Sequence, residues 1–129
     1  MDERNNLFYV CSLVEYIGRE RKLRRADVVA GLGEPVIRRI FNYADTFHCE
    51  QIAKVADDFI TVCKLPLGSF DNVSSCRYVV PGYWDIGAVY ARLIEDVSDG
   101  ADRVTKLMEV YSSWMSDALS RFNSDLFYQ

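Results

Sequence analysis

The stretch Leu7-Phe-Tyr-Val-Cys-Ser-Leu-Val-Glu-Tyr-Ile17 decides the fold class, because its apolar residues recur at intervals of three and four. The residues with this spacing are Leu7, Val10, Cys11, Val14 and Ile17. An α-helix brings residues three and four apart onto one face, so the stretch predicts a helix with one buried face. Gly18 follows directly and is expected to begin the end of this helix.

The same spacing recurs along most of the chain. We expect five further helices, at residues 25–30, 34–44, 52–63, 86–97 and 104–122, of which the last is the longest. Gly31 and Gly33 are expected to stop the second helix, and Pro35 suits the first turn of the third. Asp85 is a reasonable N-cap for the fifth. The sequence therefore predicts an all-α fold of about six helices.

Residues 64–82 break the helical pattern, because turn-forming glycine, proline, serine and asparagine residues are frequent there. Within this segment residues 76–80 are β-prone but too short to establish a sheet alone. A chain of 129 residues, half of them hydrophobic, is enough for one ordinary core. We expect a compact single domain over residues 1–129, a helical bundle with one long irregular connection at 64–82. Connections of that length are often functional.

Several functional classes find no support in the sequence. The N-terminus lacks the basic and apolar regions of a secretory signal, and no stretch approaches the roughly 20 apolar residues that span a bilayer. These features predict a cytoplasmic protein without membrane contact. The four cysteines contain no Cys-x-x-Cys pair, and no phosphate-binding or nucleophile-elbow motif occurs. We therefore predict no cofactor, and no catalytic, cofactor-binding or metal-ligating residue.

Basic residues are concentrated in residues 19–39, which carry seven basic and three acidic residues, although the whole chain has a net charge of −4. The seven are Arg19, Arg21, Lys22, Arg24, Arg25, Arg38 and Arg39. Residues 65–129 instead carry nine acidic and five basic residues. This polarity predicts that the seven basic residues bind an acidic protein partner. Because phosphates also attract such residues, a nucleic-acid-binding regulator is the alternative, although a pI near 4.9 disfavours it.

A second group of candidate partner-binding residues is aromatic. Tyr83, Trp84 and Tyr90 gather beside Asp85 and Arg92, and binding hot spots use aromatic and arginine side chains. The competing interpretation is that Trp84 packs under the connection at 64–82 while Asp85 caps a helix. The C-terminal residues 114–128 are also rich in aromatic residues, and we expect them either to fold back onto the bundle or to bind another molecule.

A small enzyme or ligand-binding protein, with a pocket near His48 or Trp84, is a second alternative. His48 is the sole histidine and adjoins Cys49. Neighbouring helical residues point about 100° apart, so these two do not face each other by spacing alone. Catalysis therefore requires the fold to bring His48 against another thiol or a carboxylate.

Three strings carry a resemblance. They are Tyr16-Ile-Gly-Arg-Glu-Arg-Lys-Leu-Arg-Arg-Ala-Asp-Val-Val29, Trp84-Asp-Ile-Gly-Ala-Val-Tyr-Ala-Arg-Leu-Ile94 and Phe122-Asn-Ser-Asp-Leu-Phe-Tyr128. With them the chain resembles a family of small uncharacterised proteins from gut-type anaerobic bacteria, with no assigned activity. The resemblance implies genes near other small, sometimes toxin-like, proteins. We therefore expect a non-enzymatic protein-interaction module, antitoxin-like or accessory, whose partner is another protein or a second copy of this chain.

Overall fold

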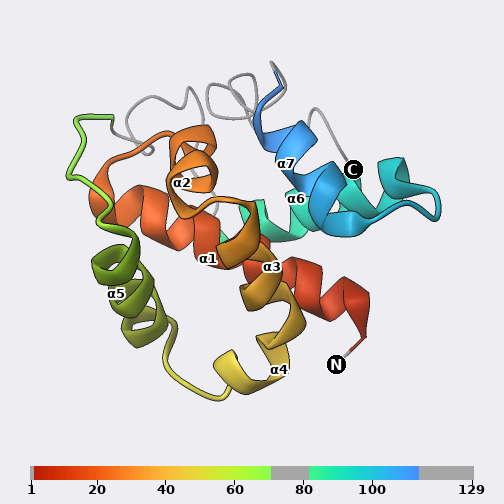
Figure 1. Ribbon diagram of the computed structural model, residues 1–129, viewed down its shortest axis with the longest axis horizontal. Helices are drawn as coiled ribbons and strands as arrows, with labels where there is room; N and C mark the ends of the chain where they lie inside the picture. The colour runs from red at the N-terminus through yellow and green to blue at the C-terminus, as the bar shows by residue number, and fades with distance from the viewer. Residues whose placement is uncertain (1, 71–81, 114–129) are drawn as a thin grey trace.

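The computed structural model describes residues 2–70 and 82–113, which form helices and no strand (Figure 1). The helices in this part of the chain are α1 (Glu3–Arg21), α2 (Arg25–Leu32), α3 (Glu34–Asn42), α4 (Ala44–Phe47), α5 (Ile52–Cys63), α6 (Tyr83–Ser98) and α7 (Arg103–Tyr111). They pack into one bundle, which confirms the predicted all-α fold class. No helix among these residues is both long and apolar enough to cross a membrane.

Helix α1 is the centre of the bundle and passes through the middle of the molecule (Figure 1). It contacts every other described helix from α2 to α6. The predicted face is fully buried, and burial extends over nearly the whole circumference from Tyr9 to Gly18. A helix that is buried all round belongs to the core rather than the surface. Each fully buried Leu or Ile contributes about 1.5–3 kcal/mol, so α1 supplies much of the hydrophobic stabilisation.

The ends of α1 differ from the prediction. The Asp2 carboxylate accepts a hydrogen bond from the Asn5 N–H at 2.9 Å and caps the helix start. Gly18 lies inside the helix, so the expectation that the helix begins to end there is wrong. The helix ends at Arg21 because Lys22 adopts the left-handed conformation, with φ of 54°, and the Leu23 N–H then reaches the Gly18 carbonyl at 3.0 Å.

Helices α2 and α3 are separated by a single residue, Gly33. Its φ of 82° is a conformation that side chains other than glycine rarely adopt, so Gly33 ends α2 where a glycine was expected. Gly31, the other predicted stop, is the penultimate residue of α2. Pro35 lies in the first turn of α3, as predicted. Residues 34–44 are not one helix, because the chain breaks at Tyr43 and a separate short α4 begins at Ala44.

The last two helices also begin and end at unexpected residues. Helix α6 starts at Tyr83 with Gly82 as its N-cap, so Asp85 is not the N-cap; its carboxylate accepts the Gly82 N–H at 3.1 Å from the third helical position. Val97, predicted to face the core, is 44% exposed. The helix predicted at 104–122 ends at Tyr111, and Ser112 is its C-cap. The remainder of that prediction lies outside the described residues.

The irregular connection begins as predicted after α5, over residues 64–70. The Gly68 N–H donates to the Arg21 carbonyl at 2.7 Å, and the Phe70 N–H donates to the Lys22 carbonyl at 3.0 Å. These bonds fasten the start of the connection to the turn between α1 and α2. Residues 71–81, including the β-prone stretch, lie outside the described part of the chain.

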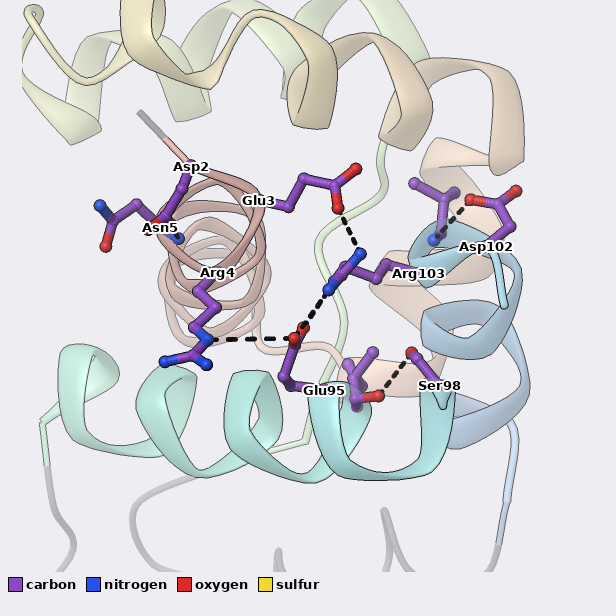
Figure 2. A network of polar contacts seen from close by, with 10 residues as sticks. Asp2, Glu3, Arg4, Asn5, Glu95, Ser98, Asp102 and Arg103 are labelled. Atoms are coloured by element: carbon purple, nitrogen blue, oxygen red, sulfur yellow. Dashed lines mark hydrogen bonds and ion pairs between the residues drawn. The ribbon is translucent and has the colours of Figure 1, made fainter. Parts of the chain in front are cut away.

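Helix α6 crosses α1 at very close range. Figure 2 views α1 nearly end-on, with α6 running across it. A Cβ atom added to Gly87 would lie 2.8 Å from both the Cα and the backbone nitrogen of Ser12. Only a residue without a side chain permits this approach. The contact fixes α6 against α1 at Ser12, one turn after Tyr83.

Candidate functional site

Two of the residues predicted to bind a partner lie inside the core. Arg25 is 5% exposed, and its guanidinium donates to the Glu15 carboxylate at 2.8 Å and to the Tyr90 hydroxyl at 3.2 Å. Tyr90 is fully buried and stacks on Tyr111, with ring centroids 4.5 Å apart. Neither Arg25 nor Tyr90 is therefore on a surface that a partner would meet. The assignment of these two residues was wrong because a run of basic residues does not reveal which one has a buried counter-ion.

The buried side chains of Glu15, Arg25 and Cys11 have pKa values that differ from their usual ones. Burial raises the pKa of the Glu15 carboxyl, against the opposing effect of the Arg25 guanidinium. Burial would lower the pKa of Arg25, but the Glu15 carboxylate and Tyr90 outweigh it and the pKa rises. Burial also raises the pKa of the Cys11 thiol to about 12. Cys11 is therefore protonated at neutral pH, and a buried thiol is not a nucleophile. The cluster holds α1, α2, α6 and α7 together.

Two further basic side chains on the predicted surface are held by partners within the chain. The Arg21 guanidinium donates to the Leu65 carbonyl at 3.1 Å. Arg38 pairs with Glu34 at 2.9 Å and with Asp102 at 2.7 Å, which joins α3 to the start of α7. Of the seven basic residues, Arg25 and Arg38 are thus paired with carboxylates of this chain, and Arg21 is held by a carbonyl.

The other four basic residues are distributed over separate places. Arg19 is half-buried, and its positive charge lowers the pKa of the Glu15 carboxyl. Lys22 and Arg24 are exposed at the turn between α1 and α2, where the Arg24 guanidinium lies 4.5 Å from the centroid of the Phe70 ring. Arg39 is exposed on α3 and lines a cleft of about 480 Å³ with Tyr43, Thr46 and Phe47. The structure does not gather the seven basic residues on one face.

Tyr83 and Trp84 do meet, and two residues of α1 join them. The Tyr83 ring lies 5.1 Å from the Tyr16 ring in an edge-to-face contact and 5.1 Å from the Trp84 ring. The Trp84 ring lies 5.4 Å from the Phe8 ring. We call Phe8, Tyr16, Tyr83 and Trp84 the aromatic cluster. Trp84 is 41% exposed and the other three are half-buried, so the cluster reaches the surface.

Sequence reasoning missed Phe8 and Tyr16 as members of this cluster. The available signal was that both are aromatic, eight residues apart, and outside the apolar stripe of the first helix. Only the crossing of α6 over α1 shows that they flank its first turn. Half-exposed aromatic residues away from a core stripe are a reason to look for a second surface.

Carboxylates adjoin the aromatic cluster. Glu20 lies one turn beyond Tyr16 on α1, and Asp57 lies on α5; both are exposed. Burial raises the pKa of the Tyr16 hydroxyl, and the charges of Glu20 and Asp57 raise it further. Both carboxylates therefore disfavour a negative charge on Tyr16.

A polar network ties the N-terminus of α1 to α6 and α7 (Figure 2). Arg103 donates two hydrogen bonds to the Glu95 carboxylate, at 2.5 and 2.7 Å, and a further one to Glu3. The Nε atom of Arg4 lies 3.9 Å from Glu95. The hydrogen bonds from Arg103 hold the pKa of Glu95 below its usual value. The network contains two arginines and two glutamates, so its charges balance. Its ion pairs stabilise the packing of α1, α6 and α7 against one another.

This network predicts a pH dependence of stability. A carboxyl whose pKa is lowered by folding contributes stability above its unfolded pKa, and this is lost as the pH falls through the folded value. Replacing Arg103 with glutamine should therefore lower the melting temperature at about pH 6 more than at about pH 3. Thermal melts followed by circular dichroism measure this, with Lys106→Gln on the same helix as control. An equal loss at both pH values would contradict it.

The second alternative placed a pocket near His48. His48 and Cys49 are both exposed in the turn after α4, and the Cys49 sulfur lies 3.9 Å from Nδ1 of His48. Over residues 2–70 and 82–113, no three His, Cys, Asp or Glu side chains lie close enough together to hold a metal ion. Among the described residues, His48 forms no hydrogen bond or ion pair with a carboxylate or with a thiol other than Cys49. Comparisons with protein-family models, curated proteins and solved structures find no match for this chain.

Proposed function

We propose that this protein is a non-enzymatic interaction module that binds another protein through the aromatic cluster. The observation that carries the proposal is a large, partly exposed Trp84 ring held in place by Phe8 and Tyr83. Tryptophan and tyrosine are enriched among the residues that dominate binding energy. An exposed aromatic cluster at a fixed position is a reasonable anchor for a partner.

The packing of the cluster favours binding in a second way. Ordering a mobile side chain on binding costs about 0.5–1.5 kcal/mol. Tyr83 and Trp84 are already restrained by Phe8 and Tyr16, and the close Gly87–Ser12 contact fixes the helix that carries them. Less of the binding free energy is therefore lost to ordering.

The biological role we propose is that of an antitoxin-like or accessory regulatory protein in the cytoplasm. This proposal rests on the resemblance to small proteins encoded beside toxin-like genes. Nucleic-acid binding has less support, because Arg25 is buried and Arg38 is paired with carboxylates. A phosphate-binding face needs several free cations side by side.

Replacing Trp84 with alanine tests this function. We expect the dissociation constant for the partner, captured from the cells that encode this protein and then purified, to rise by about 30-fold or more, since hot-spot residues contribute 2 kcal/mol or more. Titration calorimetry measures the change. Tyr43→Ala is the matched control, because Tyr43 is an aromatic residue, 58% exposed, on the α3–α4 side of the molecule.

Both variants should keep the helical circular dichroism spectrum of the parent, since both side chains reach solvent. A Trp84→Ala protein that binds as tightly as the parent, or a Tyr43→Ala protein that is equally weakened, would contradict the assignment of the aromatic cluster.

A further inference from the structure

We infer that the polypeptide segment that meets the aromatic cluster is cationic and presents lysine or arginine side chains to it. This inference rests on the proposed function and adds the chemistry of the partner. It reverses the sign of charge that the amino-acid sequence alone suggests for the partner.

The edge of the aromatic cluster carries negative charge. Glu20 and Asp57 come from two different helices, are exposed, and form no ion pair with another described residue. Glu20 lies one helical turn after Tyr16 on α1, and the charges of Glu20 and Asp57 both raise the pKa of the Tyr16 hydroxyl. An approaching cation gains from both carboxylates, whereas an acidic segment is repelled by them.

The rings of the aromatic cluster can bind a cation directly. The face of a tryptophan ring attracts a guanidinium or ammonium group, and the aliphatic part of the same side chain covers apolar surface. The chain uses this pairing twice internally: Arg24 lies over Phe70 at 4.5 Å, and Arg25 lies over Tyr90 at 5.1 Å. A partly exposed Trp84 offers the same contact to a partner.

Several of the basic residues that favoured an acidic partner are held by other groups of this chain. Arg25 is buried against Glu15, Arg21 is bonded to the Leu65 carbonyl, and Arg38 is paired with two carboxylates. Within α1, Arg19 is half-buried, and its positive charge lowers the pKa of Glu15. The count of arginines in residues 19–39 therefore overstates the positive charge that is open to a partner.

The probe that tests this inference is a displayed library of random 15-residue peptides, selected on the full-length chain. Selection is run in parallel on the Trp84→Ala variant, and only peptides that require Trp84 are kept. We expect these to carry a net positive charge, with lysine or arginine beside an apolar residue. Dissociation constants of the best synthetic peptide are then measured with Glu20→Gln/Asp57→Asn.

Removing both carboxylates should weaken that peptide about tenfold at low salt, since each exposed charge pair contributes modestly to binding. The loss should shrink at about 0.5 M salt because of screening. The control is Asp45→Asn/Asp99→Asn, which changes the net charge equally at exposed positions on α4 and after α6. Asparagine is tolerated in the left-handed conformation of residue 99.

The outcomes separate this inference from the proposed function. The cationic partner is overturned if the Trp84-dependent peptides are acidic or neutral. It is also overturned if they bind Glu20→Gln/Asp57→Asn as tightly as they bind the control. Either result leaves the aromatic cluster as a binding surface. A selection that yields no Trp84-dependent peptide overturns both. Cationic, Trp84-dependent peptides that are weakened only by loss of Glu20 and Asp57 support both.

Discussion

Replacing Arg25 with methionine is expected to lower the free energy of unfolding by about 3–5 kcal/mol, because removal of one partner leaves a buried charge uncompensated. The Glu15 side chain is only 2% exposed, and Arg25 donates to it at 2.8 Å. The same substitution removes the donor to the buried Tyr90 hydroxyl. Urea unfolding followed by circular dichroism measures the change.

The double variant Glu15→Leu/Arg25→Met keeps this prediction testable even if the single variant does not fold. Apolar residues of similar volume often replace a buried ion pair at little net cost, so the double variant should recover most of the lost stability. Arg39→Met, at an exposed position on α3, should change stability by no more than about 0.5 kcal/mol. A loss below about 1 kcal/mol for Arg25→Met would show that the pair does not carry a buried charge.

The second large effect is expected at the crossing of α1 and α6. Replacing a helical glycine with alanine normally stabilises a helix by about 0.5–1 kcal/mol. At Gly87 the opposite sign is expected, with a loss of about 1–3 kcal/mol, because the new Cβ would lie 2.8 Å from the backbone of Ser12. Neither backbone can yield without separating the two helices. Urea unfolding of Gly87→Ala measures the sign directly.

Gly82→Ala is the matched control for this prediction. Among the described residues, a Cβ at Gly82 would meet the Asp85 carboxylate oxygen alone, at an ordinary 3.5 Å. Its stability should change by only about 1 kcal/mol or less, as at other helix N-caps. If Gly87→Ala proved more stable than the parent, the close crossing of α1 and α6 would be wrong, and with it the position of Tyr83 and Trp84.

The helices were predictable because their apolar spacing is a local property of the chain. The stripe from Leu7 to Ile17 is buried as expected, and the helix from Ile52 to Cys63 has the predicted bounds. Helix ends were less predictable, because they depend on single residues whose conformation spacing does not show. Lys22 ends α1 in a left-handed conformation that favours glycine, while Gly18, the expected stop, is buried inside the helix.

The candidate site was only half predictable, for a physical reason. Tyr83 and Trp84 were recognisable as adjacent amphipathic aromatic residues, but their neighbours Phe8 and Tyr16 come from a helix that is distant in sequence. The role of Arg25 was not predictable, because its counter-ion Glu15 and its hydrogen-bond partner Tyr90 lie on two other helices. Pairing between helices is set by the tertiary structure, whereas charge counts are read along the chain.

The central claim is that the aromatic cluster is where a partner protein binds. Its most direct test is a photo-crosslinking amino acid placed at residue 84, and separately at residue 43, in the cells that encode this protein. We predict one discrete crosslinked protein from residue 84, identified by mass spectrometry, and none from residue 43. No adduct at residue 84, or the same adducts from both positions, would contradict the claim.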